Sequence, residues 1–190
     1  MSDSLSGDSL HQVLITRRTI HSYKPEAVPE DAVWRALEAA HHAPNHKLTW
    51  PWRFTWAGPE TRRQLTNLVV AVKARAAPLT EDQRKKVEAK VQTPAHLVVV
   101  SVQREADSFR AREDYAAASC AIQNFMLSLH GHGIGSKWGT GRVTREEATY
   151  ELLGISPDDE EIIGFVWVGV PSMVPEIQRP TLSEHVRRLP

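Results

Sequence analysis

The sequence predicts a mixed α/β (α+β) domain in which helices cover both faces of a central sheet. Apolar residues recur every three or four positions in five or six segments, as in amphipathic helices. Four shorter segments between them alternate or are apolar throughout, as in strands. The composition, 41% hydrophobic and 24% charged over 190 residues, is that of an ordinary globular protein. Because no repeat or linker interrupts the chain, we expect one domain over 1–190, with a disordered start at 1–7.

In the first half of the chain, helices are expected at 8–18, from 29 to a stop at Pro44, from 59, and at 80–91. Proline at a first helical position and the capping-box pair Thr80 and Gln83 mark three of these starts. The second helix is expected to bury one face, made of Val33, Trp34, Leu37, Ala40 and His41. Residues 52–57 alternate like a half-buried strand.

In the second half, residues 97–102 and 162–170 are apolar runs typical of buried strands, and the second run is expected inside the sheet. A long helix is expected at 108–130, with a buried line of Ala118, Ile122, Phe125, Met126 and Leu129. Residues 134–138 form a short strand candidate. The pair Thr144 and Glu147 predicts a capping box for a last helix that ends at Gly154.

The charge balance excludes several classes of function. Lys plus Arg and Asp plus Glu number 23 each, which argues against a basic nucleic-acid-binding face. No apolar run reaches the ~20 residues of a membrane helix, and no secretory signal is visible. The single cysteine, Cys120, forms no internal disulfide and is expected in the core. We therefore expect a cytoplasmic protein without membrane or nucleic-acid partners.

The triplet Arg17, Arg18 and Thr19 follows the first predicted helix. Two guanidinium groups and a hydroxyl together suit a phosphate group, because arginine donates paired hydrogen bonds to its oxygens. The same cations also suit the negative end of a helix dipole without any ligand. Both interpretations remain open at this point.

Three histidines, His41, His42 and His46, surround Pro44. A metal site is one interpretation, but no cysteine or carboxylate lies among them, and neighbouring residues of a helix point about 100° apart. A loop that presents imidazole donors to an electron-rich ligand is favoured over metal, and surface or packing roles remain open.

Two glycine-rich segments follow the long helix. The glycines at 131, 133 and 135 come after a helix and before a strand, which is the reverse of the Rossmann order, so a Rossmann fold is rejected. Gly139, Thr140 and Gly141 let the backbone pass close to a flat or anionic ligand, although a simple tight turn explains them equally well.

Taken in order, these segments resemble the nitroreductase family of flavoproteins over 10–189. The resemblance rests on the Arg-Arg-Thr opening, Ala-Pro-Asn-His-Lys at 43–47, Trp-Pro-Trp-Arg-Phe at 50–54, Trp-Gly-Thr-Gly at 138–141 and the closing segment from Arg179. The small, minimal branch of the family is the most similar. The resemblance implies a nitroreductase-like three-layer fold with a mostly antiparallel sheet and an intertwined homodimer.

The resemblance also implies FMN at the subunit interface. Its phosphate side would be held by Arg17, Arg18 and Thr19, with Arg179 as a further phosphate ligand. His42 and His46 would reach the flavin from the partner chain, and Gly139, Thr140 and Gly141 would complete the site. NAD(P)H is assigned to Ser128, Leu129, His130, Gly131, His132 and Gly133. Many members have lysine where this chain has His21, which leaves open how the reduced flavin is stabilised.

The implied activity is a ping-pong reduction of nitroaromatics, quinones or similar electron-poor molecules by NAD(P)H. No side chain is expected to act as a catalytic residue and no metal is expected, because flavin carries the chemistry. Two alternatives remain: a flavin-binding or regulatory protein without turnover, and a relative acting on flavin itself or on halogenated aromatics.

Overall fold

The computed structural model describes residues 7–190, and within this range it contains six α-helices and four strands. The helices are α1 (Gly7–Thr16), α2 (Glu30–His41), α3 (Pro59–Ala74), α4 (Glu81–Gln92), α5 (Ser108–Gly131) and α6 (Glu147–Leu153). The strands are β1 (Trp52–Trp56), β2 (His96–Gln103), β3 (Gly135–Gly139) and β4 (Glu160–Gly169). Three 3-10 helices join them: η1 (His46–Leu48), η2 (Arg142–Arg145) and η3 (Leu182–His185). The disordered start expected at 1–7 lies outside the described residues except for Gly7, where α1 begins.

The four strands form one antiparallel sheet in the order β1-β2-β4-β3. The two interior strands, β2 and β4, are the apolar runs that were expected to be buried, and residues 97–102 are buried without exception. The edge strands β1 and β3 are shorter and less apolar. The sequence-based placement of 162–170 inside the sheet is therefore confirmed.

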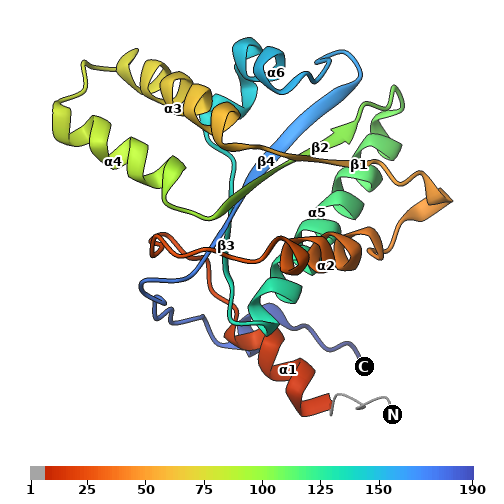
Figure 1. Cartoon of the computed structure of the whole chain (residues 1–190). Coiled ribbons are helices and arrows are strands. Elements are labelled where there is room, and N and C mark those ends of the chain that lie inside the picture. Colours follow the sequence, from red (N-terminus) through yellow and green to blue (C-terminus); the bar gives the residue numbers. More distant parts are fainter. Residues whose placement is uncertain (1–6) are drawn as a thin grey trace.

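Helices cover both faces of the sheet, which makes three layers (Figure 1). On one face, α2 and α5 pack Val33, Ala36, Ile122 and Phe125 against Val98, Val100 and Val166 of the interior strands. On the other face, α3, α4 and α6 pack Leu65, Val91 and Tyr150 against Leu97, Val99 and Phe165. Each fully buried large side chain contributes about 1.5–3 kcal/mol, so both faces stabilise the domain.

Three residues expected in the core are exposed: Cys120, Trp34 and His41. The line Ala118, Ile122, Phe125, Met126 and Leu129 of α5 is buried as expected, but Cys120 is exposed. Two residues on from Ala118, it lies about 200° around the helix and so points away from the sheet. Trp34 of α2 is 63% exposed, because Val33 and Ala36 take the inward positions. Its indole instead lies edge-on to Trp56 of the edge strand. His41 is the last residue of α2, and its imidazole accepts a hydrogen bond from the Trp52 indole instead of packing in the core.

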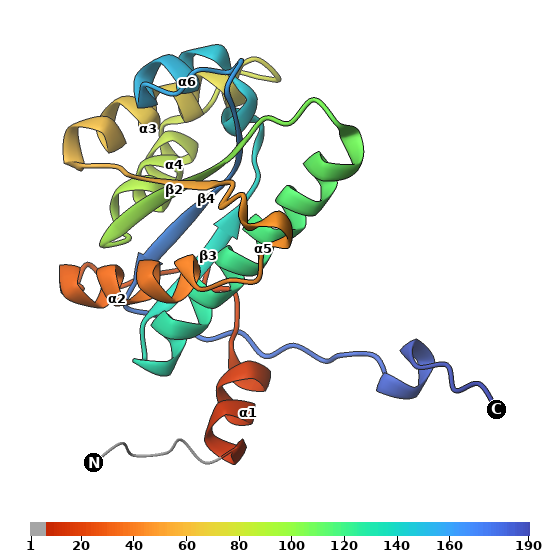
Figure 2. The same cartoon turned by 90° about the vertical axis from the view of Figure 1, so that its right-hand side faces the viewer.

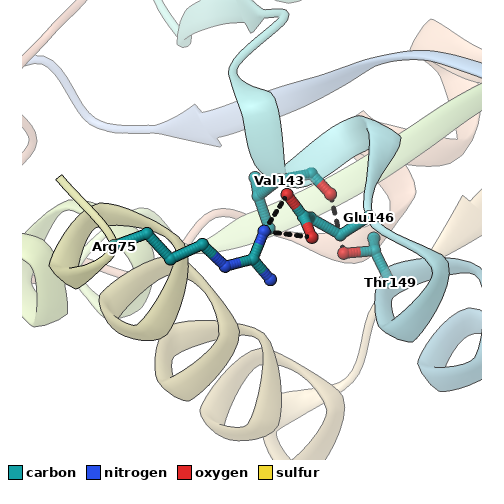
Figure 3. Close-up of polar contacts among 4 residues, drawn as sticks. All are labelled: Arg75, Val143, Glu146 and Thr149. Atoms are coloured by element: carbon teal, nitrogen blue, oxygen red, sulfur yellow. Dashed lines mark hydrogen bonds and ion pairs between the residues drawn. The ribbon is translucent and has the colours of Figure 1, made fainter.

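The start of α6 also differs from the expectation. The expected capping box of Thr144 and Glu147 is absent, because residues 142–145 form η2 and the Thr144 hydroxyl donates to the Gly141 carbonyl at 2.9 Å. Thr149 closes this corner by donating to the Val143 carbonyl at 2.7 Å, while Arg75 at the end of α3 pairs with Glu146 at 2.8 Å (Figure 3). These contacts fix the segment after β3. Gly154 ends α6, as predicted, and the structure shows it in the left-handed conformation.

Two terminal segments project from the three layers. Figure 2 shows α1 and the extended C-terminal tail leaving the body of the domain. Both expose large apolar side chains: Leu10, Leu14 and Ile15 on α1, and Met173, Val174, Ile177, Leu182, Val186 and Leu189 on the tail. Among the described residues, no helix has the length and apolar character needed to cross a membrane.

Candidate functional site

The Arg-Arg-Thr triplet lies beside the edge strand β3. The helix α1 ends at Thr16, two residues earlier than expected, which leaves Arg17 to Thr19 in an extended segment. Thr19 forms an isolated parallel bridge with Ser136, and the amide of Ile20 donates to the Ser136 carbonyl at 3.0 Å. Ile20 is buried and anchors the segment. Thr19 and Ser136, which are 117 residues apart in the sequence (136 − 19), are thus neighbours along one sheet edge.

Three arginines gather at the start of this segment: Arg17, Arg18 and Arg179, called here the arginine cluster. Burial, together with the charges of Arg179 and Arg18, lowers the pKa of Arg17. Among the described residues, Nη1 of Arg17 is buried without a hydrogen-bond partner, and no ion pair includes any of the three. A buried, unsatisfied donor among like charges is costly, so the cluster fits an anionic group such as phosphate.

The segment from Ser128 to Gly133 lies beside the arginine cluster. Nε2 of His130 lies 2.9 Å from the Thr16 hydroxyl, and burial together with the charges of Arg17 and Arg18 lowers the pKa of His130. His132 turns back onto the Ser128 carbonyl at 2.9 Å. Leu129 is buried in the core, so only its backbone could meet a ligand. The assignment of this segment to NAD(P)H stays a prediction.

The histidine-rich loop lies at the opposite edge of the sheet. It precedes β1, whereas Gly139 to Gly141 follow β3, and these are the two edge strands. His42 and His46 are exposed, while Nδ1 of His41 accepts a hydrogen bond from the Trp52 indole at 3.2 Å. The described residues contain no group of three or more potential metal ligands. A single chain therefore does not bring His42 and His46 to the arginine cluster.

The loop is nevertheless held in a defined, strained shape. Lys47, Leu48 and Trp50 have φ angles of 62°, 55° and 41°, a region that residues other than glycine rarely adopt. Thr49 donates to the buried carboxylate of Asp114 at 2.7 Å, and Asn45 bonds to both Thr49 and the Trp50 amide. Strain that is held in place by a hydrogen-bond network fixes where His46 is presented.

The Gly-Thr-Gly segment leaves β3 at the other edge. Trp138, just before it, donates to the Ile163 carbonyl at 3.1 Å and packs against the α2/α5 core. Its ring occupies the space that a side chain at Gly164 would need. Because side chains alternate along a strand, Lys137 and Gly139 face the α3/α4 side. Trp138 thereby fixes where Gly139 to Gly141 emerge.

A cavity of about 240 Å³ opens on that side, and we call it the basic cavity. Its lining includes Gly139 and Gly141 together with four basic side chains: His21, Lys73, Lys90 and Lys137. Burial and the nearby charge of Lys90 lower the pKa of Lys137. Burial raises the pKa of Tyr23, which keeps this phenol protonated. The arginine cluster and the basic cavity thus lie at the two ends of the extended segment 17–21.

Comparison with known proteins decides the family. Residues 14–170 match the model of the Nitroreductase family.

The chain belongs to the nitroreductase family.

Three relatives illustrate the match. The chain is 32% identical over 176 residues to the Bacillus subtilis (strain 168) protein named "Putative NAD(P)H nitroreductase YfhC", covering 90% of this chain and 89% of that protein. The crystal structure of a nitroreductase-like family protein from Bacillus cereus has a TM-score of 0.82 at 25% identity, covering 100% and 98% of the two chains. A Desulfovibrio desulfuricans structure, described as "a putative nitroreductase in complex with fmn", has a TM-score of 0.75 at 25% identity, covering 95% of this chain and 96% of that chain. The nitroreductase-like fold expected from the sequence is confirmed.

Sequence reasoning missed part of the basic cavity. Lys73, Lys90 and Lys137 lie on three different elements, and nothing in the local sequence shows that they meet. Only Lys137 could have been predicted from the sequence. It lies two residues before Gly139, so strand alternation puts both residues on the same face of β3.

Proposed function

We propose that this nitroreductase-family chain is an FMN-dependent oxidoreductase that uses NAD(P)H to reduce nitroaromatics, quinones or similar electron-poor molecules. The arginine cluster carries the proposal, because a buried Nη1 of Arg17 without a partner fits the phosphate of FMN. The family match and the relative named for NAD(P)H support the same activity.

The chain's own residues would bind and orient the cofactor. Arg17, Arg18 and Arg179 would hold the phosphate, with the Thr19 hydroxyl as a further donor. The backbone from Gly139 to Gly141 would pass close to the flavin ring, because Gly139 and Gly141 have no side chains. Lys137 lines the adjoining cavity beside His21 and would place positive charge at that end of the site.

Bound FMN would supply the redox chemistry, namely acceptance of a hydride from NAD(P)H and, in a ping-pong order, transfer of the electrons to a second substrate. For a nitro group, one hydride from NAD(P)H and one proton from solvent yield a nitroso group and one water. The protein contributes binding, orientation and electrostatics, and no side chain is required as a general base.

The proposal includes a homodimer. His42 and His46 lie at the sheet edge opposite to Gly139, so they can reach a cofactor site only on a second chain. The exposed apolar side chains of α1 and the tail support the same conclusion, since large exposed apolar surfaces mark interaction sites. We also propose a cytoplasmic location, supported by the exposed free thiol of Cys120, which suits a reducing compartment.

Steady-state kinetics tests the function. NAD(P)H oxidation should accelerate with nitroaromatic or quinone acceptors, and double-reciprocal plots at several acceptor concentrations should be parallel, as ping-pong requires. If the purified protein is yellow but NAD(P)H does not reduce its flavin, the result would instead indicate a flavin-binding protein without turnover. Intersecting lines would contradict the ping-pong order.

A further inference from the structure

The basic cavity carries positive charge without matching negative charge. Four of its lining side chains are basic, His21, Lys73, Lys90 and Lys137, and its lining contains no acidic residue. It lies between the α3/α4 pair, seen side by side in Figure 1, and the face of β3 and β4. Lys73 and Lys90 come from the helices, whereas Lys137 comes from the strand.

Nothing in the described part of the chain neutralises these lysines. None of the three forms an ion pair there. Lys137 is half-buried, and burial together with the nearby charge of Lys90 lowers the pKa of Lys137. Lys73 and Lys90 are exposed, but like charges that line one cavity still repel each other, and a bound anion would relieve that repulsion. The complement of this cavity is therefore a negatively charged group.

The walls next to these charges are apolar and aromatic. Phe165 and Trp167 line the basic cavity. A second cavity of about 580 Å³ adjoins it and shares Val69, Lys73, Gly141 and Val143. The remaining residues that line this second cavity are largely apolar and include Val72, Pro78 and Leu79. Lys73 thus stands where apolar and basic linings meet, which suits a ligand with a flat apolar body and one anionic group.

We propose that the preferred electron-accepting substrates of this protein are aromatic anions, such as aromatic carboxylates, whose charge is held by Lys73 and Lys90. This assignment rests on the proposed function, which places the cofactor against the β3 side of the same cavity. The two lysines occupy the opposite, helical wall, where they face the second substrate. The apolar cavity receives the substrate's ring.

The test compares two acceptors of nearly the same shape, 4-nitrobenzoate and 4-nitrobenzamide, with the FMN-loaded protein. The wild type should show a higher kcat/KM for the carboxylate, and the preference should shrink as salt rises. An exposed ion pair contributes about 1.5- to 5-fold, so Lys73→Gln with Lys90→Gln should remove most of the preference while 4-nitrobenzamide changes less than about twofold. The control Lys86→Gln removes an exposed lysine of α4 that lines neither cavity and should keep the preference.

Two results would overturn the proposal: equal kcat/KM for the two acceptors, or a preference that survives in the double variant. A surviving preference together with a shifted flavin midpoint potential would assign the lysines to the cofactor. If the protein reduces neither of these acceptors and no quinone, the proposed function fails separately. Calorimetric titration with benzoate and benzamide then decides the matter, because only lysine-dependent binding of benzoate supports an anion site.

Discussion

Arg17→Met provides the sharpest test of the arginine cluster. Methionine keeps much of the apolar stem of Arg17 but removes its charge and the buried Nη1 that has no partner among the described residues. A charge-assisted hydrogen bond contributes about 1.5–3 kcal/mol, so the FMN dissociation constant should rise about 10- to 150-fold. Riboflavin, which lacks the phosphate, should bind the variant and the wild type equally well.

Fluorescence titration of the apoprotein with both flavins measures this directly. Arg112→Met is the matched control, because Arg112 is an exposed arginine of α5 and should leave both affinities unchanged. The apoprotein of Arg17→Met should be no less stable than the wild type, since burial and the charges of Arg179 and Arg18 disfavour the charged form of Arg17 in the folded state. An equal loss of FMN and riboflavin affinity would refute the reasoning.

Four further outcomes are expected. His46→Ala should weaken flavin binding or NAD(P)H oxidation without unfolding the protein, and a chelator should leave activity intact. Light scattering should give twice the 21.3 kDa chain mass, with about one FMN per chain. Gly164→Ala should cost about 1–3 kcal/mol of unfolding free energy and weaken flavin binding, because the new methyl group meets the Trp138 ring. The pKa of His130 is lowered in the folded apoprotein, so its contribution to stability is present above the ordinary histidine pKa and is lost as the pH falls below that value. His130→Gln should remove this pH dependence, as measured by denaturation at several pH values.

Each of these outcomes has a contrary result. One equivalent of zinc that is lost together with activity in the His46 variant would make that loop a metal site. A monomer that retains stoichiometric FMN would contradict the dimer. Gly164→Ala with unchanged stability would mean that Trp138 moves freely. An identical pH dependence of denaturation in wild type and His130→Gln would contradict a lowered pKa of His130 in the folded protein.

Local patterns predicted the elements wherever the determinants are close in sequence. The capping box of Thr80 and Gln83 forms as expected, because both hydrogen bonds join residues three apart. The same pattern failed at Thr144, since the hydroxyl bonds to Gly141 in a 3-10 turn. The inward face of α2 was predicted wrongly at Trp34 and His41, which are both exposed. Size and apolar character were weighted above angular position, whereas the small residues Ala32, Ala36 and Ala40 share the buried face with Val33.

The candidate site was only partly readable from the sequence. The arginine and glycine motifs were identified because each is a compact run with an unusual composition. That they meet along β3 depends on the bridge between Thr19 and Ser136, which no local pattern encodes. Lys73 of α3 and Lys90 of α4 could not be predicted as cavity residues for the same reason. In the sequence they do not differ from other surface lysines of amphipathic helices, and only the tertiary fold places them over a cavity.

Anaerobic titration of the purified, FMN-loaded protein with NADH and NADPH tests the central claim most directly. We expect one of the nicotinamides to bleach the flavin absorbance at about one equivalent per FMN, and a nitroaromatic or quinone to restore the colour. A protein that binds no FMN, or whose bound FMN neither nicotinamide reduces, would contradict the account.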